Sequence, residues 1–179
     1  GQLLELDIMN NRSNLNKLLL ELRTSCYPLI NSISFGVDPK RGRLESVHYL
    51  TIHGVRLLEE TYGELLAIKY PKGTHQLFQK DYFHRLCTVS FHIVLSSRAK
   101  QQHFELKRFV TYFDKLTSGR SKGFRAESAI EIHAGQYLIA DAVFLLQTRQ
   151  RAELYCVEVY MDDDTSRIHN SLFGHLQAL

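Results

Sequence analysis

Apolar and polar positions along the chain repeat with the helical period in some stretches and with the strand period in others. Helices are predicted over residues 3–23, 52–62 and about 80–99. Ser13 or Asn14 is the expected cap of the first helix, which ends before Pro28 because proline cannot continue the hydrogen-bond ladder. Thr51 is the expected N-cap of the second helix.

Strand-like runs dominate the second half of the chain. Strands are predicted at residues 47–50, 65–70, 104–113, 129–133, 137–146 and 154–161. The helices and short strands of the first 75 residues fit a small winged-helix-like unit, and the turn-rich segment 70–79 is the expected junction. We therefore predict an α+β or α/β protein, with domains at residues 1–75 and 80–179. The second domain is expected to hold a mixed sheet flanked by helices.

Two carboxylates interrupt the last apolar runs. Asp141 lies within residues 137–146, and Glu158 lies within residues 154–161. Burying an unpaired carboxylate costs several kcal/mol or forces it to take up a proton, so a shared partner is expected. Mg²⁺ or Mn²⁺, which prefer oxygen ligands, would be such a partner, and a pairing with a nearby arginine is the alternative. The strand period would put Glu158, Tyr160 and Asp162 on one face.

A basic segment with interleaved aromatic residues suggests nucleic acid as a partner. Residues 100–125 hold seven basic residues against two acidic ones, whereas the whole chain has a net charge of only +3. Such a segment suits a phosphate backbone and unstacked bases, although a solvated hairpin gives the same pattern. The candidate DNA-binding residues are Lys107, Arg108, Arg120, Lys122 and Arg125, together with Arg41 and Arg43 in an earlier turn-rich loop.

Cysteine usage and hydropathy favour a cytoplasmic location. The three cysteines have no close spacing and sit among apolar residues, so buried thiols in a reducing compartment are expected. No apolar run is long enough for a membrane span, and the first residues show no secretory signal pattern. We expect no membrane partner.

The chain resembles the replication-relaxation family of plasmid proteins, which includes the C class of plasmid mobilisation relaxases. Residues 139–144 and 155–160, followed by a polar turn and a helix, resemble the core of restriction-endonuclease-like, or PD-(D/E)XK, nucleases. Residues 49–54 match the winged-helix-like part of the family. His84 matches a histidine near the start of the helix that follows, and Glu127 matches a glutamate that precedes the strand with the metal-binding aspartate.

The resemblance implies a bacterial, cytoplasmic, metal-dependent endonuclease that nicks DNA at a plasmid transfer origin, with another mobilisation or coupling protein as a further partner. Asp141 and Glu158 would hold Mn²⁺ or Mg²⁺, Glu127 would be a further ligand or orienting carboxylate, and His84 would be an accessory acid, base or orienter.

Two departures from the family pattern keep a second function open. Ala140 stands where the signature has proline, and Tyr160 stands where it has the lysine that stabilises the attacking water or the transition-state charge. The alternative is a non-catalytic DNA-binding accessory or replication protein with a degenerate nuclease fold. Three further alternatives are open. Tyr112, Tyr155 or Tyr160 could be the nucleophile of a covalent nicking reaction, the acidic row 162–164 could bind a metal ion, and the protein could be a protein-interaction adaptor.

Overall fold

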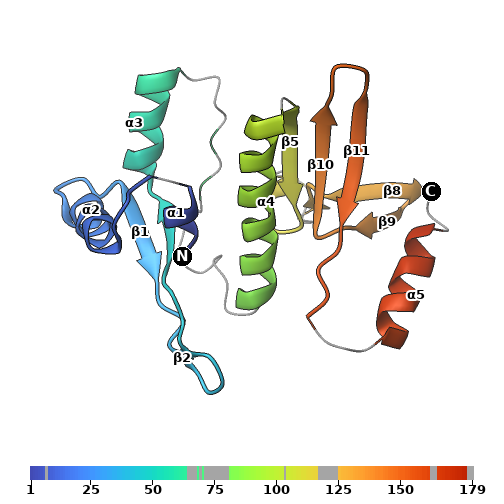
Figure 1. Cartoon of the computed structure of the whole chain (residues 1–179), viewed down its shortest axis with the longest axis horizontal. Coiled ribbons are helices and arrows are strands. Elements are labelled where there is room, and N and C mark those ends of the chain that lie inside the picture. Colours follow the sequence, from blue (N-terminus) through green and yellow to red (C-terminus); the bar gives the residue numbers. More distant parts are fainter. Residues whose placement is uncertain are drawn as a thin grey trace. The chain divides into compact units, whose positions relative to one another are not determined.

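The computed structural model describes residues 1–6, 8–63, 68, 70, 81–102, 104–116, 125–161 and 165–176. The chain divides into two compact units, Gly1–Tyr82 and Phe83–Leu179. Both belong to a mixed α/β protein with helices and small antiparallel sheets (Figure 1). Most of the expected strand 65–70, and residues 71–79 of the expected junction, lie outside the described part.

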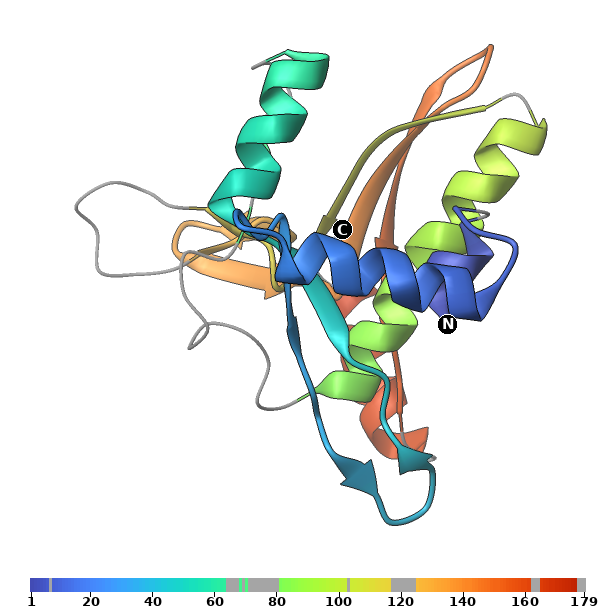
Figure 2. The ribbon, with the colours of Figure 1, turned by 90° about the vertical axis from the view of Figure 1, so that its left-hand side faces the viewer.

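The N-terminal unit places a two-stranded ribbon between two helices. Its elements are α1 (Gln2–Glu5), α2 (Arg12–Thr24), β1 (Ile30–Ile33), β2 (Val37–Asp38), β3 (Gly42–Arg43), β4 (Val47–Leu50) and α3 (Ile52–Tyr62). Strand β1 pairs antiparallel with β4, and β2 pairs antiparallel with β3. Together they form a long ribbon whose β2–β3 turn extends away from α2 and α3 (Figure 2).

Capping decides where the two longer helices of this unit begin. The side chain of Asn11 accepts the backbone N–H of Ser13 at 2.6 Å, so the expected cap at Ser13 or Asn14 is wrong. The expected single helix over residues 3–23 is two helices. Thr51 caps α3 as predicted, with its hydroxyl oxygen 3.3 Å from the N–H of Gly54.

Helix α3 packs very close to the chain segment that leads into β1. A Cβ atom at Gly54 would overlap the carbonyl oxygen of Leu29, and the neighbouring Val55 is 3% exposed. The backbone N–H of Thr51 also donates to Leu29 at 3.0 Å. Only glycine therefore allows this approach.

The C-terminal unit combines helices with three short antiparallel sheets. Its elements are α4 (Tyr82–Gln102), β5 (Glu105–Thr111), β6 (Lys115–Leu116), β7 (Arg125–Ala126), β8 (Ala129–His133), β9 (Gln136–Ile139), β10 (Ala142–Gln147), β11 (Ala152–Val157) and α5 (Thr165–Leu176). The largest sheet has the order β11-β10-β5, and β6 pairs with β7 and β8 with β9. All pairings among the described strands are antiparallel, so the sheets differ from the mixed sheet that was expected.

Aromatic side chains join α4 to the three-stranded sheet. The ring of Phe91 on α4 lies 5.8 Å from that of Phe144 and 6.3 Å from that of Phe109. The imidazole of His92 stacks on Phe109 with the ring centres 3.9 Å apart. These contacts fix the helix against one face of the sheet, next to β5 (Figure 1).

The two apolar runs that carry the acidic residues are shorter strands than expected. Residues 137–146 are divided between β9 and β10, and Asp141 lies in the break between them. Strand β11 ends at Val157, so Glu158 follows the strand instead of lying within it. The predicted alternation of Glu158, Tyr160 and Asp162 along one strand face is therefore wrong for the first two, and Asp162 lies outside the described residues.

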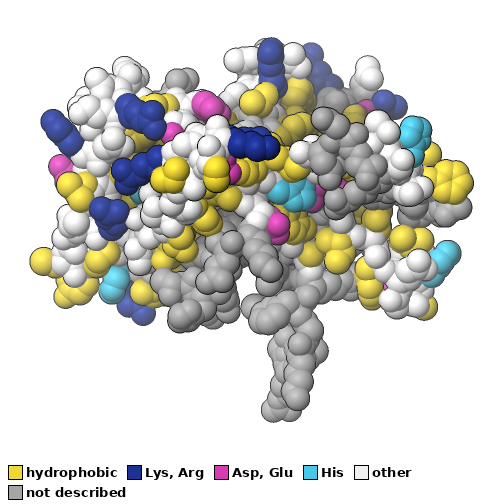
Figure 3. All heavy atoms as spheres, turned by 90° about the horizontal axis from the view of Figure 1, so that it is seen from below, with side chains coloured by type: hydrophobic (Ala, Val, Ile, Leu, Met, Phe, Trp, Pro, Cys, Tyr) yellow, Lys and Arg dark blue, Asp and Glu magenta, His cyan; other side chains and the backbone are white. Residues whose placement is uncertain are grey.

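Apolar side chains and all three thiols reach the surface. Cys26, Cys87 and Cys156 are exposed and free, which contradicts the expectation of buried thiols. Exposed apolar residues occur in both units, and several are visible on the face shown in Figure 3. Among the described residues, no helix has the length and hydropathy needed to cross a membrane.

Candidate functional site

Asp141 is a buried carboxylate held by its neighbours on both sides. It is 8% exposed, and its Oδ2 atom accepts the backbone N–H of Val159 at 2.7 Å. Its own carbonyl oxygen accepts the N–H of Tyr112 at 3.1 Å. Val159 follows the end of β11. Its N–H binds the carboxylate instead of a neighbouring strand, and this bond holds the segment after β11 against Asp141.

His84, near the start of α4, reaches the same carboxylate. Its Nε2 atom lies 3.0 Å from Asp141 Oδ2, and the two side chains are 27% and 11% exposed. The ring of Tyr112 lies 5.5 Å from the imidazole ring. The same oxygen, Oδ2, accepts the N–H of Val159, so it has two contacts. The contact at 3.0 Å orients the imidazole of His84 towards Asp141.

Glu158 lies next to Asp141 and is electrostatically coupled to it. Burial and the negative charge of Asp141 raise the pKa of Glu158 to about 7, and a hydrogen bond between the two carboxyl groups adds to the increase. A raised pKa of this origin means that two carboxylates are close together with too little positive charge to balance them. Near neutral pH, the carboxyl pair therefore binds one proton in some of the molecules and none in the others.

Small buried residues fix the backbone around Asp141. Ala140 and Ala142 on either side are fully buried. The hydroxyl of Ser128, which is 1% exposed, donates to the carbonyl oxygen of Ala140 at 2.5 Å. On α4, the buried hydroxyl of Thr88 donates to the carbonyl oxygen of His84 at 3.1 Å. The two backbone segments that present His84 and Asp141 are thus both held by buried hydroxyls.

Glu127, the fourth predicted site residue, makes a different contact. Its side chain is 5% exposed, and its carboxylate lies 3.8 Å from the guanidinium of Arg108, which is 68% exposed. Its backbone N–H donates to Asp114 at 2.8 Å. An arginine therefore balances the charge of Glu127, and its role as a metal ligand remains a prediction.

The predicted DNA-binding residues lie on two separate parts of the chain. Lys107 and Arg108 are exposed on β5, where Lys107 also pairs with Glu105 at 2.7 Å. Arg41 and Arg43 are exposed at the β2–β3 turn. Arg120, Lys122 and the acidic row 162–164 lie outside the described residues, and Arg125 begins β7 with a side chain that is also outside them.

The tyrosines considered as nucleophiles have different surroundings. Tyr155 donates its hydroxyl to Glu153, and this hydrogen bond raises the pKa of Tyr155. The hydroxyl of Tyr160 is buried, and no hydrogen-bond partner for it is found among the described residues. The roles of Val159, Ser128 and Thr88 were not anticipated, because backbone contacts and small hydroxyl residues leave no distinctive pattern in a single sequence.

Other acidic, histidine or cysteine side chains do not complete a larger cluster in the described part of the chain. There, no group of three or more such residues is arranged to hold a metal ion. The site thus consists of one adjacent carboxyl pair, Asp141 and Glu158, with His84 in contact with the first.

Comparisons with protein-family models, with curated proteins and with solved structures gave no match.

Proposed function

We propose that this protein is a metal-dependent, DNA-nicking relaxase that hydrolyses a phosphodiester bond at a plasmid transfer origin. The adjacency of the Asp141 and Glu158 carboxyl groups carries the proposal, because the pKa of Glu158 is raised to about 7 by burial and by Asp141. The two residues directly flank the Ala142–Val157 pair of the β10–β11 hairpin, and carboxyl pairs with perturbed pKa values are typical of functional sites.

The carboxyl pair fits Mg²⁺ or Mn²⁺. Both cations prefer carboxylate oxygens, and a divalent charge would offset the repulsion that raises the pKa of Glu158. Asp141 and Glu158 would hold the ion, which when bound supplies Lewis acidity and lowers the pKa of coordinated water. Glu127 is a weaker candidate ligand because Arg108 already balances its charge.

His84 and the backbone would orient this pair. The imidazole at 3.0 Å and the N–H of Val159 at 2.7 Å fix the direction of the Asp141 carboxylate. His84 would also hold or release a proton at Nε2, on the side of the site that is partly open to solvent. In the proposed fold, the C-terminal unit is a restriction-endonuclease-like core and the N-terminal unit is winged-helix-like, with the β2–β3 turn as its wing.

A non-catalytic DNA-binding protein is the second candidate, and two observations favour it. Tyr160 replaces the signature lysine, and its hydroxyl is buried. Asp141 Oδ2 already accepts two contacts, which is sufficient to stabilise a buried carboxylate without a metal ion.

Nicking of supercoiled plasmid that carries the cognate transfer origin distinguishes the two candidates. With Mn²⁺, the wild type is expected to convert closed plasmid to open circles with free DNA ends and no covalent adduct. Glu158→Gln, which keeps the shape but removes the charge, should abolish nicking with little change in DNA affinity. Glu131→Gln, on the exposed face of β8, is the matched control and should nick normally.

Closed plasmid after incubation with wild type and Mn²⁺ would favour the non-catalytic candidate. Nicking that survives Glu158→Gln but is lost in a tyrosine variant would replace hydrolysis with a covalent tyrosine mechanism.

A further inference from the structure

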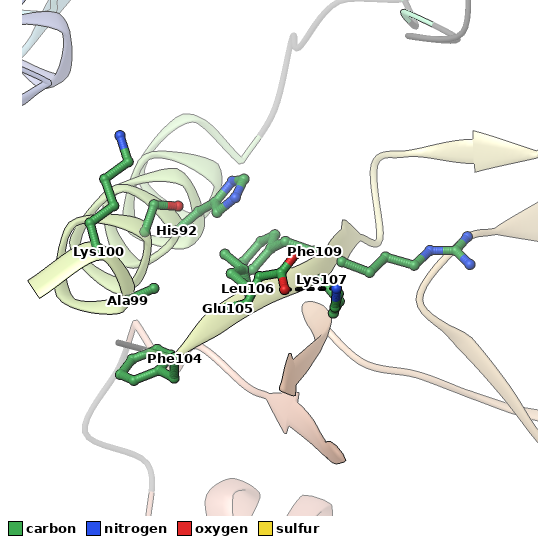
Figure 4. Close-up of a pocket in the computed structure, with 10 residues that line it drawn as sticks. His92, Ala99, Lys100, Phe104, Glu105, Leu106, Lys107 and Phe109 are labelled. Atoms are coloured by element: carbon green, nitrogen blue, oxygen red, sulfur yellow. Dashed lines mark ion pairs between the residues drawn. The ribbon is translucent and has the colours of Figure 1, made fainter. Parts of the chain in front are cut away.

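A groove between α4 and β5 lies at the far end of α4 from His84. It encloses about 430 Å³ and is formed entirely by residues 92–109 of the C-terminal unit. Figure 4 shows His92 and Ala99 on the helix opposite Phe104, Leu106 and Phe109 on the strand side. The volume lies within the range of sites that take a small organic molecule or a single nucleotide.

The floor of this groove is aromatic and apolar. Phe104 and Leu106 are half-buried, and Ala99 is 5% exposed. His92 and Phe109 stack almost in parallel, with 3° between their planes, and burial lowers the pKa of His92. The imidazole covers one face of the Phe109 ring and, being neutral, adds no buried charge, so a further ring can stack on the outer face of His92.

The rim of the groove carries cations on both sides. Lys100 is exposed on α4 and Lys107 is exposed on β5 (Figure 4). Glu105 pairs with Lys107 at 2.7 Å, with the two side chains 64% and 46% exposed. Because both ions of this pair are largely solvated, a phosphate can compete for the lysine, and the exposed glutamate remains as a hydrogen-bond acceptor.

We propose that the α4–β5 groove binds one unstacked nucleotide of a single-stranded DNA segment. The base stacks against the wall formed by Phe104 and the His92–Phe109 pair, and the flanking phosphates contact Lys100 and Lys107. An aromatic floor and a basic rim are the two features that single-strand sites combine. The inference rests on the proposed function for the identity of the ligand, because the single strand is taken to be the DNA strand that the protein nicks.

The absence of tryptophan from the sequence gives this proposal a direct test. Phe104→Trp places a single indole at the groove, and Leu154→Trp places one on β11, where Leu154 is 66% exposed. Oligothymidylate of twelve nucleotides is titrated into the full chain in EDTA, so that no cleavage occurs. Stacking should quench the Phe104→Trp emission and leave the Leu154→Trp emission unchanged.

Two further ligands separate base stacking from charge alone. An abasic oligonucleotide of the same length should leave the Phe104→Trp emission unchanged, and a blunt duplex should quench it much less than the single strand. Equal quenching by the abasic strand, or equal quenching of both tryptophan variants, would overturn the proposal.

The lysines are tested in the wild-type background, which also covers a failure of Phe104→Trp to fold. Lys100→Ala combined with Lys107→Ala should lower the slope of log affinity against log salt by about 1.4, which corresponds to two single-strand phosphate contacts. Lys17→Ala combined with Arg149→Ala removes two exposed cations elsewhere and should leave the slope unchanged. An unchanged slope for the groove pair would overturn the proposal. These assays contain no metal ion, so their outcome is independent of whether the protein nicks DNA.

Discussion

Replacing Glu158 with glutamine is expected to stabilise the protein at alkaline pH while abolishing its proposed activity. Burial and the charge of Asp141 raise the pKa of Glu158 from 4.5 to about 7 in the folded chain. Below pH 4.5 the group is protonated in both states. As the pH rises towards 7, the unfolded chain loses the proton first, so the folded state of the wild type loses stability.

The size of this effect follows from the difference in pKa. A change from 4.5 to about 7 corresponds to about 3 kcal/mol at 1.36 kcal/mol for each pH unit. Because Glu158 is only partly buried, screening by solvent reduces the expected contribution to about 2 kcal/mol. Glutamine has no charge to bury and can still donate a hydrogen bond to Asp141. Glu158→Gln should therefore gain about 2 kcal/mol over wild type at pH 8 and almost nothing at pH 4.5.

Urea denaturation at pH 4.5 and pH 8, followed by circular dichroism, measures this difference. The control Glu131→Gln removes an exposed carboxylate from β8 of the same unit and should change the free energy of unfolding by less than about 0.5 kcal/mol at both pH values. An equal effect of Glu158→Gln at the two pH values would refute the electrostatic coupling of Glu158 to Asp141. A gain in stability accompanied by loss of nicking is the pattern expected of a functional site.

Three further predictions follow from the same structure. His84→Ala removes a donor from a buried carboxylate and should lower the free energy of unfolding by about 1.5 kcal/mol, measured by urea denaturation; no change would mean that the contact at 3.0 Å is not maintained in solution. Gly54→Ala should cost about 2 kcal/mol in thermal unfolding because the new Cβ overlaps the backbone of Leu29. Gly36→Ala has open space for its Cβ and should cost less, because it is destabilised only by the φ of +78°. Cys26 and Cys87 should react rapidly with a thiol reagent in the native protein, and Cys156 should react more slowly because burial and the charge of Glu158 raise its pKa; slow reaction of Cys26 or Cys87 would contradict its exposure.

Local rules predicted the parts of the fold that depend on neighbouring residues. The cap at Thr51 and the helix 52–62 are set by a hydroxyl and the N–H three residues later. The start of α2 was misplaced because Asn11, Ser13 and Asn14 can all act as an N-cap, and Asn11 is the one that does. The separate short helix α1 was read as part of α2.

Long-range contacts determined what the sequence could not reveal. Residues 137–146 read as one strand, but they form β9 and β10, and Asp141 between them accepts the N–H of Val159 with its carboxylate. The proximity of Asp141, Glu158 and His84 was anticipated from residue type and family resemblance, whereas the geometry depends on α4 packing on the sheet. The expectation that the thiols are buried was wrong, because apolar neighbours in sequence do not show which side of a strand or helix is covered.

Binding of Mn²⁺ with its coupled proton release tests the central claim most directly. If Asp141 and Glu158 hold the ion, binding must displace the proton that Glu158 retains because its pKa is about 7. Calorimetry in buffers of different ionisation enthalpy should show release of about 0.9 proton at pH 6 and about 0.1 at pH 8. Glu158→Gln should bind weakly without proton release, and Asp141→Asn should not bind. Absence of binding to the wild type, or equal binding and proton release in Glu158→Gln, would contradict the metal site.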